Sequence, residues 1–148
     1  MKHLGVDHGN KRIGISISDE LGLFARPLLI LEHVSRIVDA EAVAALAVEH
    51  MCDSIVVGLP MDSDGSIGHR ARLVNRFIEI LSEQINIPVI AWDESFSTRK
   101  AVQNSILRGE KQKKRKKAID DQAAAIILQD YLDTLHTRKM GGESENQT

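Results

Sequence analysis

Residues 2–18, KHLGVDHGNKRIGISIS, decide the fold. The segment 12–18 alternates isoleucines with small or polar residues, the period of two that is typical of a strand with one buried face. The segment 2–6 is short and mostly apolar, and the turn signal Gly9-Asn10 lies between the two. This pattern predicts two antiparallel strands joined as a hairpin.

Strand and helix patterns alternate after the hairpin. A leading meander followed by alternating helices and strands predicts an α/β fold, with a mixed sheet whose later strands are parallel and with helices on both faces. The further expected elements are a strand after Pro27 (LLIL), a helix over 35–50 with Ser35 as N-cap, a strand over 54–57, a helix over about 67–84, a strand over 88–92, a helix around 97–107 and a last helix over 119–135.

Apolar spacing predicts which side of each helix is buried. In the helix over 35–50, the predicted inward residues are Ile37, Val38, Ala42, Ala45 and Leu46. In the helix over 67–84, they are Leu73, Phe77, Ile80 and Leu81.

Length and composition predict one domain. The chain has 148 residues, 43% of them hydrophobic and 27% charged, and these values are ordinary for a globular protein. We expect one domain over 1–138 and a disordered polar tail over 139–148. The single cysteine, Cys52, excludes a disulfide framework and favours a small buried residue in a cytoplasmic protein. The sequence shows neither a signal peptide nor an apolar run of the roughly 20 residues that a membrane helix needs.

The charge is unevenly distributed. The formal net charge is −2, yet residues 108–117 carry seven cations and one acid, and the flanking parts are each acidic. Such a cluster occurs in solvated loops, and it is also typical of loops that bind the phosphates of nucleic acid. Asp120 follows directly, which favours the second interpretation. The seven cations are Arg108, Lys111, Lys113, Lys114, Arg115, Lys116 and Lys117.

Three carboxylates are predicted to meet at one end of the sheet. Asp7 ends the first strand, and Glu94 follows the strand over 88–92 at the end where ligands collect in α/β sheets. Asp120 begins the last helix in a row with Ala124, Ile127 and Tyr131, away from a solvent face centred near Gln122, Gln129, Asp130 and Asp133. Each acid alone also fits a turn, a strand end or a helix start. Together they predict a site for Mg²⁺ or Mn²⁺ of the two-metal type.

Four segments resemble the YqgF family, also called RuvX, whose members are pre-16S rRNA nucleases and Holliday-junction-resolvase-like proteins. The segments are LGVDHGNKRIGISISDELGLFARPL, IVVGLPMDSDGSIGHRA, WDESFST and KKRKKAIDDQAAAIILQDYLD, in order over residues 3–133. The resemblance implies an RNase H-like fold, and it places the family's three acids on Asp7, Glu94 and Asp120. It also implies metal-dependent cleavage of structured nucleic acid and a role in maturing the 5′ end of 16S rRNA.

Three positions depart from the family's pattern. Ser95 replaces the arginine that follows the glutamate, His8 replaces an aromatic residue after the first aspartate, and Asp62 replaces an asparagine.

Three functions remain open at this point. The first is a nuclease for precursor rRNA or branched DNA, in which Lys11, Arg12 and the cations of 108–117 bind phosphates, with the small ribosomal subunit as a possible partner and a monomer or weak dimer as the active form. The second is a nucleic-acid-binding protein that does not cleave, such as a ribosome-assembly or transcription factor. The third is a phosphotransferase, suggested by the first phosphate loop of sugar kinases, although 148 residues supply only one of the two lobes such enzymes need.

Overall fold

The computed structural model describes residues 1–60, 68–93 and 122–137. The helices and strands are β1 (His3–His8), β2 (Arg12–Ser18), β3 (Ala25–Glu32), α1 (Arg36–Glu49), β4 (Ser54–Leu59), α2 (His69–Gln84), β5 (Val89–Asp93) and a last helix over 122–137. The expected helix around 97–107, Asp62, Ser95 and the predicted tail lie outside the described residues.

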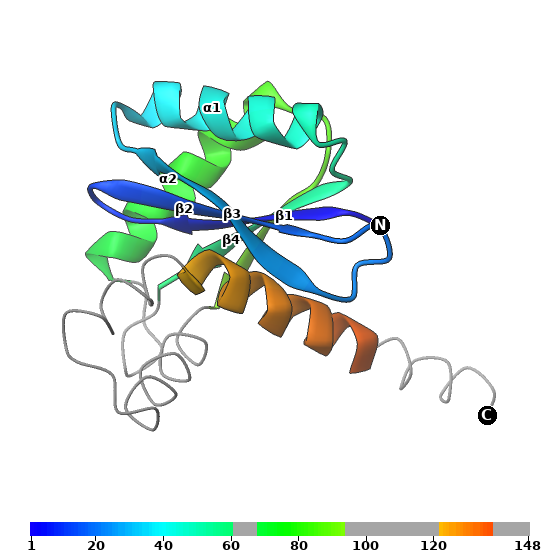
Figure 1. The fold of residues 1–148 in the computed structure, drawn as a ribbon. Helices are drawn as coiled ribbons and strands as arrows, with labels where there is room; N and C mark the ends of the chain where they lie inside the picture. The colour runs from blue at the N-terminus through cyan, green and yellow to red at the C-terminus, as the bar shows by residue number, and fades with distance from the viewer. Residues whose placement is uncertain (61–67, 94–121, 138–148) are drawn as a thin grey trace.

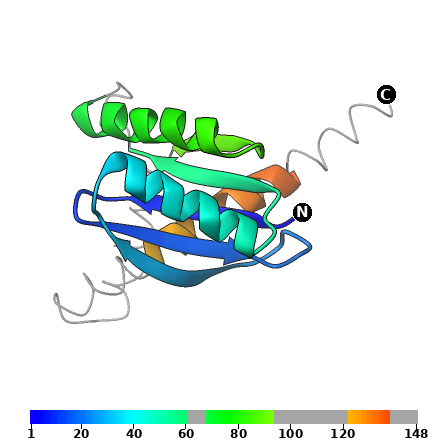
Figure 2. The same cartoon turned by 90° about the horizontal axis from the view of Figure 1, so that it is seen from above.

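The strands form one mixed sheet in the order β3-β2-β1-β4-β5. β1 is antiparallel to β2, and β2 to β3, whereas β4 runs parallel to both β1 and β5. Helices α1 and α2 cover one face of the sheet, and the helix over 122–137 covers the other (Figures 1 and 2). The predicted hairpin, the mixed sheet and the helices on both faces are therefore confirmed.

The main core lies between the sheet and the α1–α2 layer. Leu4 and Val6 of β1 are fully buried there with Phe77 and Leu81 of α2. Both α2 residues were predicted inward, whereas Leu73 and Ile80 are only half-buried. Cys52 belongs to this core as expected, and burial raises the pKa of its thiol.

The predicted inward face of α1 is wrong for three of its five residues, whereas Ala42 and Leu46 are half-buried and Leu46 packs against the core. Ile37, Val38 and Ala45 are exposed, and the buried residues are Asp39, Ala40, Val43, Ala44 and Ala47. The helix is apolar on almost every side, so periodicity could not distinguish its faces. The N-cap is correct, because the Ser35 hydroxyl accepts a hydrogen bond from the Val38 N–H at 3.2 Å.

The helix over 122–137 packs directly on β1. Gly5 allows this approach: a Cβ on Gly5 would lie 2.1 Å from the Ser16 Oγ, 2.8 Å from the Leu128 Cβ and 3.0 Å from the Ala124 carbonyl oxygen. The buried Ser16 hydroxyl donates to that same carbonyl at 2.7 Å. At the far end of β1, the His3 ring meets Tyr131 edge-on at 5.8 Å.

The prediction for this helix is right for its inward row and wrong for part of its solvent face. Ala124 and Ile127 are buried as expected. Gln129 and Asp130 are half-buried, because Gln129 accepts from the Ala25 N–H and donates to the Leu23 carbonyl, and Trp92 donates to Asp130. No described helix meets the length and apolarity that crossing a membrane requires.

Gly5→Ala should destabilise the protein by about 1–3 kcal/mol, because the methyl group overpacks the contact between β1 and the last helix. Urea denaturation followed by circular dichroism measures the change in the free energy of unfolding. Ser16→Ala is the control: it removes the hydroxyl that donates to Ala124 without adding volume, and should cost about 1 kcal/mol. A Gly5→Ala protein as stable as the wild type would contradict the close approach.

Stability should fall as the pH falls below about 6.5, the ordinary pKa of histidine. Burial lowers the pKa of His3, with the N-terminal ammonium adding to the effect and Asp53 opposing it, and burial also lowers the pKa of His8. As the pH falls, the two histidines are therefore protonated in the unfolded chain before they are protonated in the folded protein. Their contribution to the free energy of unfolding is complete above the histidine pKa of the unfolded chain, and it is lost as the pH falls through the lower pKa of the folded protein.

Thermal unfolding at pH 7.5, 6.5 and 5.5 checks this expectation. His3→Gln should flatten the dependence on pH, whereas His50→Gln, at the half-exposed C-cap of α1, should not. An identical slope in the His3→Gln protein would contradict the assignment.

Candidate functional site

Asp7 lies near the carboxyl end of β1, on the side of the sheet that faces the helix over 122–137. Side chains alternate along a strand, and Leu4 and Val6 pack into the core on the opposite side. His3 contacts Tyr131, and Gly5 lies against Leu128, so Asp7 is the third member of the helix-facing row. Its side chain is half-buried at the end of that row.

The neighbouring strand presents no side chain beside Asp7. Val6 pairs with Val57 of β4, so Asp7 and Gly58 come next in the two strands, and Gly58 pairs with Trp92 of β5. Val56 packs on the helix side, and Gly58, two residues further along, shares that side without presenting a side chain. Gly58 is buried, so on this face β4 contributes backbone and no side chain between Asp7 and β5.

Asp93, the last residue of β5, lies on the other side of the sheet. Trp92 meets Tyr131 at 5.3 Å and donates its indole N–H to Asp130 at 2.9 Å, which places Trp92 on the helix-facing side. The alternation puts Asp93, which is exposed, on the side of α1 and α2. Asp93 and Asp7 therefore do not share a face.

The other predicted acids, Glu94 and Asp120, lie outside the described residues, as do the seven cations of 108–117. Among residues 1–60, 68–93 and 122–137, no three His, Cys, Asp or Glu side chains are grouped so that they could hold a metal ion. Of the three predicted acids, the described part contains Asp7, a hard oxygen donor of the kind that Mg²⁺ or Mn²⁺ binds.

His8 packs as an aromatic residue and points away from Asp7. Its ring stacks on Phe77 with the centroids 4.5 Å apart, in the α2 layer. Burial lowers the pKa of His8, while the Asp39 carboxylate opposes that shift. Its Nε2 is buried and has no hydrogen-bond partner among the described residues. The imidazole therefore packs in the α2 layer as an apolar aromatic ring would.

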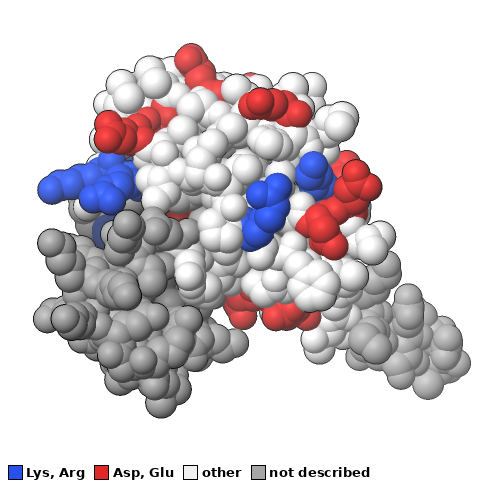
Figure 3. Space-filling model, in the orientation of Figure 1, with Lys and Arg blue, Asp and Glu red and all other residues white. Residues whose placement is uncertain are grey.

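The connection between β1 and β2 presents cations at the same end of the sheet. Lys11 and Arg12, both predicted to bind phosphates, are exposed there. The turn is closed by the Gly9 N–H donating to the Arg12 carbonyl at 2.9 Å, and Arg70 at the start of α2 donates to the His8 carbonyl at 3.3 Å. Blue side chains gather at the left edge of Figure 3, the end at which Figure 1 shows this connection.

Sequence reasoning missed two features of this end. Arg70 follows the DGS segment in the chain, but nothing in its spacing indicated the bond to the β1–β2 connection. Asp39, which is 2% exposed and bonded to His33, looked like an ordinary first-turn acid of a helix.

The fold is that of the RNase H-like resolvases. The chain is similar to T. thermophilus RuvC in complex with Holliday junction substrate, with a TM-score of 0.57 and 15% identity over 92% of this chain and 96% of the other. It is also similar to the Fowlpox virus resolvase in complex with substrate Holliday junction DNA, with a TM-score of 0.54 and 16% identity over 91% of this chain and 99% of the other. At these identities, the likeness defines the fold alone.

The family follows from the sequence matches. The family model RuvX, described as Holliday junction resolvase, matches residues 1–134. A protein of Geobacillus kaustophilus (strain HTA426) named "Putative pre-16S rRNA nuclease" is 40% identical, covering 90% of this chain and 99% of its own length. One of the same name from Syntrophus aciditrophicus (strain SB) is 37% identical, covering 97% and 96%. The chain belongs to the RuvX family and is a nuclease, a hydrolase by class.

His8→Phe should raise the free energy of unfolding by about 1 kcal/mol, because it removes a buried nitrogen that lacks a partner and keeps the stacking on Phe77. Urea denaturation at pH 7.5 measures the change. His8→Ala is the comparison: it empties the same space and should cost about 2–4 kcal/mol. If the phenylalanine variant loses as much as the alanine variant, the ring does not play this packing role.

Proposed function

We propose that this chain is a metal-dependent endonuclease for structured nucleic acid, and that it processes the 5′ end of precursor 16S rRNA. The observation that carries the proposal is the position of Asp7: it is half-buried at the carboxyl end of β1, faces the last helix, and lies beside Gly58 of β4, which has no side chain. The relatives named for pre-16S rRNA support the substrate.

The direction of β5 supports Glu94 as the second acid. Ile90 and Trp92 pack on the helix-facing side of the sheet, and a strand that continued for one residue would place position 94 on that same side. Asp93 faces the other way. The proposal therefore pairs Asp7 with Glu94 rather than with Asp93, across the backbone of β4 at Gly58.

The direction of the last helix supports Asp120 as the third acid. Tyr131 lies at His3 and Leu128 at Gly5, so moving toward the start of the helix corresponds to moving along β1 toward Asp7. Position 120 precedes Ala124 by four residues, so a helix that continued for two residues before 122 would place it about one turn further toward that end. The same face of the helix thus leads to the carboxylate of Asp7.

Asp7, Glu94 and Asp120 are then the residues that would hold Mg²⁺ or Mn²⁺. When bound, two such ions supply an activated water and neutralise the leaving oxygen of a phosphodiester. Lys11 and Arg12 bind non-bridging phosphate oxygens beside the scissile bond, and the cations of 108–117 extend that contact along the backbone. We place this reaction in the cytoplasm, with the small ribosomal subunit as the partner and a monomer or weak dimer as the active form.

Branched DNA is the second candidate substrate. The family description and the two similar structures, both solved with Holliday junctions, favour it. A protein that binds nucleic acid without cutting it would show binding without metal-stimulated turnover.

Asp7→Asn should reduce metal-dependent cleavage at least about 100-fold, because losing a ligand removes several kcal/mol of transition-state stabilisation. The assay follows a labelled 16S fragment with its 5′ extension and a labelled four-way DNA junction, each with Mg²⁺ or Mn²⁺ at low salt. Asp93→Asn is the matched control, since it removes a carboxylate from the opposite side of β5 and should leave cleavage unchanged.

The outcomes separate the candidates. Faster cleavage of the RNA supports the proposed substrate, and faster cleavage of the junction favours the alternative. Equal rates for Asp7→Asn and the wild type would refute the assignment of Asp7. Binding of both probes without turnover by the wild type would refute the enzyme activity itself.

A further inference from the structure

We propose that His33, held in place by Asp39, contacts a phosphate of the bound nucleic acid beyond the β1–β2 connection. This inference rests on the proposed function and extends the substrate path to the β3 edge of the sheet. Neither residue belongs to the predicted acids or cations of the site.

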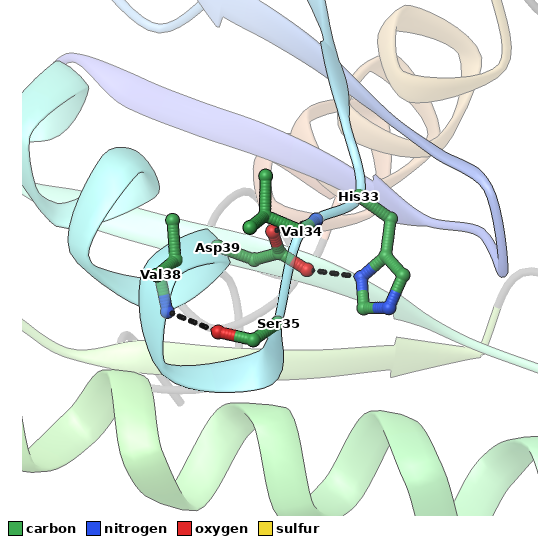
Figure 4. A network of polar contacts seen from close by, with 5 residues as sticks. All are labelled: His33, Val34, Ser35, Val38 and Asp39. Carbon is green, nitrogen blue, oxygen red and sulfur yellow. Dashed lines mark hydrogen bonds and ion pairs between the residues drawn. The ribbon is translucent and has the colours of Figure 1, made fainter.

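Asp39 orients the His33 ring from inside the fold. The Asp39 Oδ2 lies 2.5 Å from the His33 Nδ1, and the Oδ1 accepts from the Val34 N–H at 3.0 Å. The carboxylate is 2% exposed, whereas the His33 side chain is 40% exposed. Figure 4 shows the second ring nitrogen pointing away from Asp39. A buried carboxylate therefore fixes a solvent-accessible imidazole.

The pair has a local role, because the His33 ring bonds the second oxygen of the buried Asp39 carboxylate, whose first oxygen accepts from the Val34 N–H. That bond uses one ring nitrogen and holds the half-exposed ring in one orientation. An oriented imidazole with one free nitrogen is a suitable partner for a phosphate oxygen.

His33 lies at the same end of the sheet as Asp7. The backbone N–H of His33 donates to the Lys11 carbonyl at 2.9 Å, so the His33 backbone lies beside the connection that carries Lys11 and Arg12. Asp7 pairs with Gly14, and Gly14 pairs with Ile30, three residues before His33. Two spacings across the sheet, at right angles to three residues along β3, give a separation of about 14 Å between the Asp7 and His33 Cα atoms. At about 3.4 Å per nucleotide, that is roughly four nucleotides along one strand.

The surroundings of the ring favour an anion. Lys11, Arg12 and Arg70 lie around the β1–β2 connection, and Arg36 follows on α1. The acids close by are Asp39, which is buried against the ring, and Glu32, whose strand position lies opposite Arg12. A strand that leaves Asp7 along this edge therefore meets cations first and His33 next.

The first experiment compares two histidines at opposite ends of α1. His33→Gln should raise the Kd for a labelled four-way DNA junction and for a labelled 16S 5′-extension RNA by about three- to tenfold, measured by fluorescence anisotropy in EDTA at low salt. His50→Gln should leave both Kd values unchanged. Asp39→Asn should weaken binding similarly, and combining it with His33→Gln should add no further loss.

The second experiment uses the wild-type protein, so it does not depend on a variant folding. On addition of either probe, the ¹⁵N-imidazole resonances of His33 should shift, and those of His50 should not. Unchanged His33 resonances together with equal Kd values for the two glutamine variants would overturn the inference. The inference about His33 can fail while the proposed function holds: in that case the wild type binds and cleaves the probes, and the Asp7→Asn protein does not cleave them. If the wild type binds neither probe, both proposals fail.

Discussion

The contact on which this structure depends is the one between β1 and the helix over 122–137. A side chain at Gly5 would overlap Ser16 and Leu128, so only glycine lets the helix backbone approach the sheet this closely. The buried hydrogen bond from Ser16 to the Ala124 carbonyl then fixes the position of the helix along β1. As a result, the helix begins at the end of the sheet where Asp7 lies.

Because side chains alternate along β1, its core residues and Asp7 lie on opposite sides of the sheet. Leu4, Val6 and His8 face the core of α1 and α2, whereas Gly5 and Asp7 face the last helix. Two adjacent residues, Asp7 and His8, thus have unrelated roles. A change at His8 acts on packing and on the dependence of stability on pH, whereas the role proposed for Asp7 is in the reaction.

The sequence predicted best those elements in which the apolar residues repeat with a single period, that of a strand or that of a helix. The isoleucines of β2 and the turn at Gly9-Asn10 predicted the hairpin, and the position of Asp7 at the end of β1 followed from it. The buried row of the last helix, with Ala124 and Ile127, was also predictable, because its polar residues are well separated from its apolar ones.

The inward face of α1 was not predictable, because alanine and valine occur around most of the helix. Burial of Asp39 depends on His33 and Val34, which precede the helix, and no helical period contains that information. Gln129 and Asp130 turned inward for a similar reason: their partners, Ala25 and Trp92, belong to strands far away in the chain. The roles of Glu94, Asp120 and the cations of 108–117 stay predictions, as do the domain limits.

The central claim is that Asp7 holds a divalent metal on the helix-facing side of β1. Crystals soaked in Mn²⁺ and measured at the manganese absorption edge test it directly, because anomalous scattering locates the ion without any assumption about substrate. If Asp7 holds the metal, an anomalous peak is expected within about 2.0–2.4 Å of an Asp7 carboxylate oxygen, a distance typical of hard cations with oxygen ligands. A peak bound by Asp93 on the opposite side, or no peak at Asp7 at saturating Mn²⁺, would contradict it.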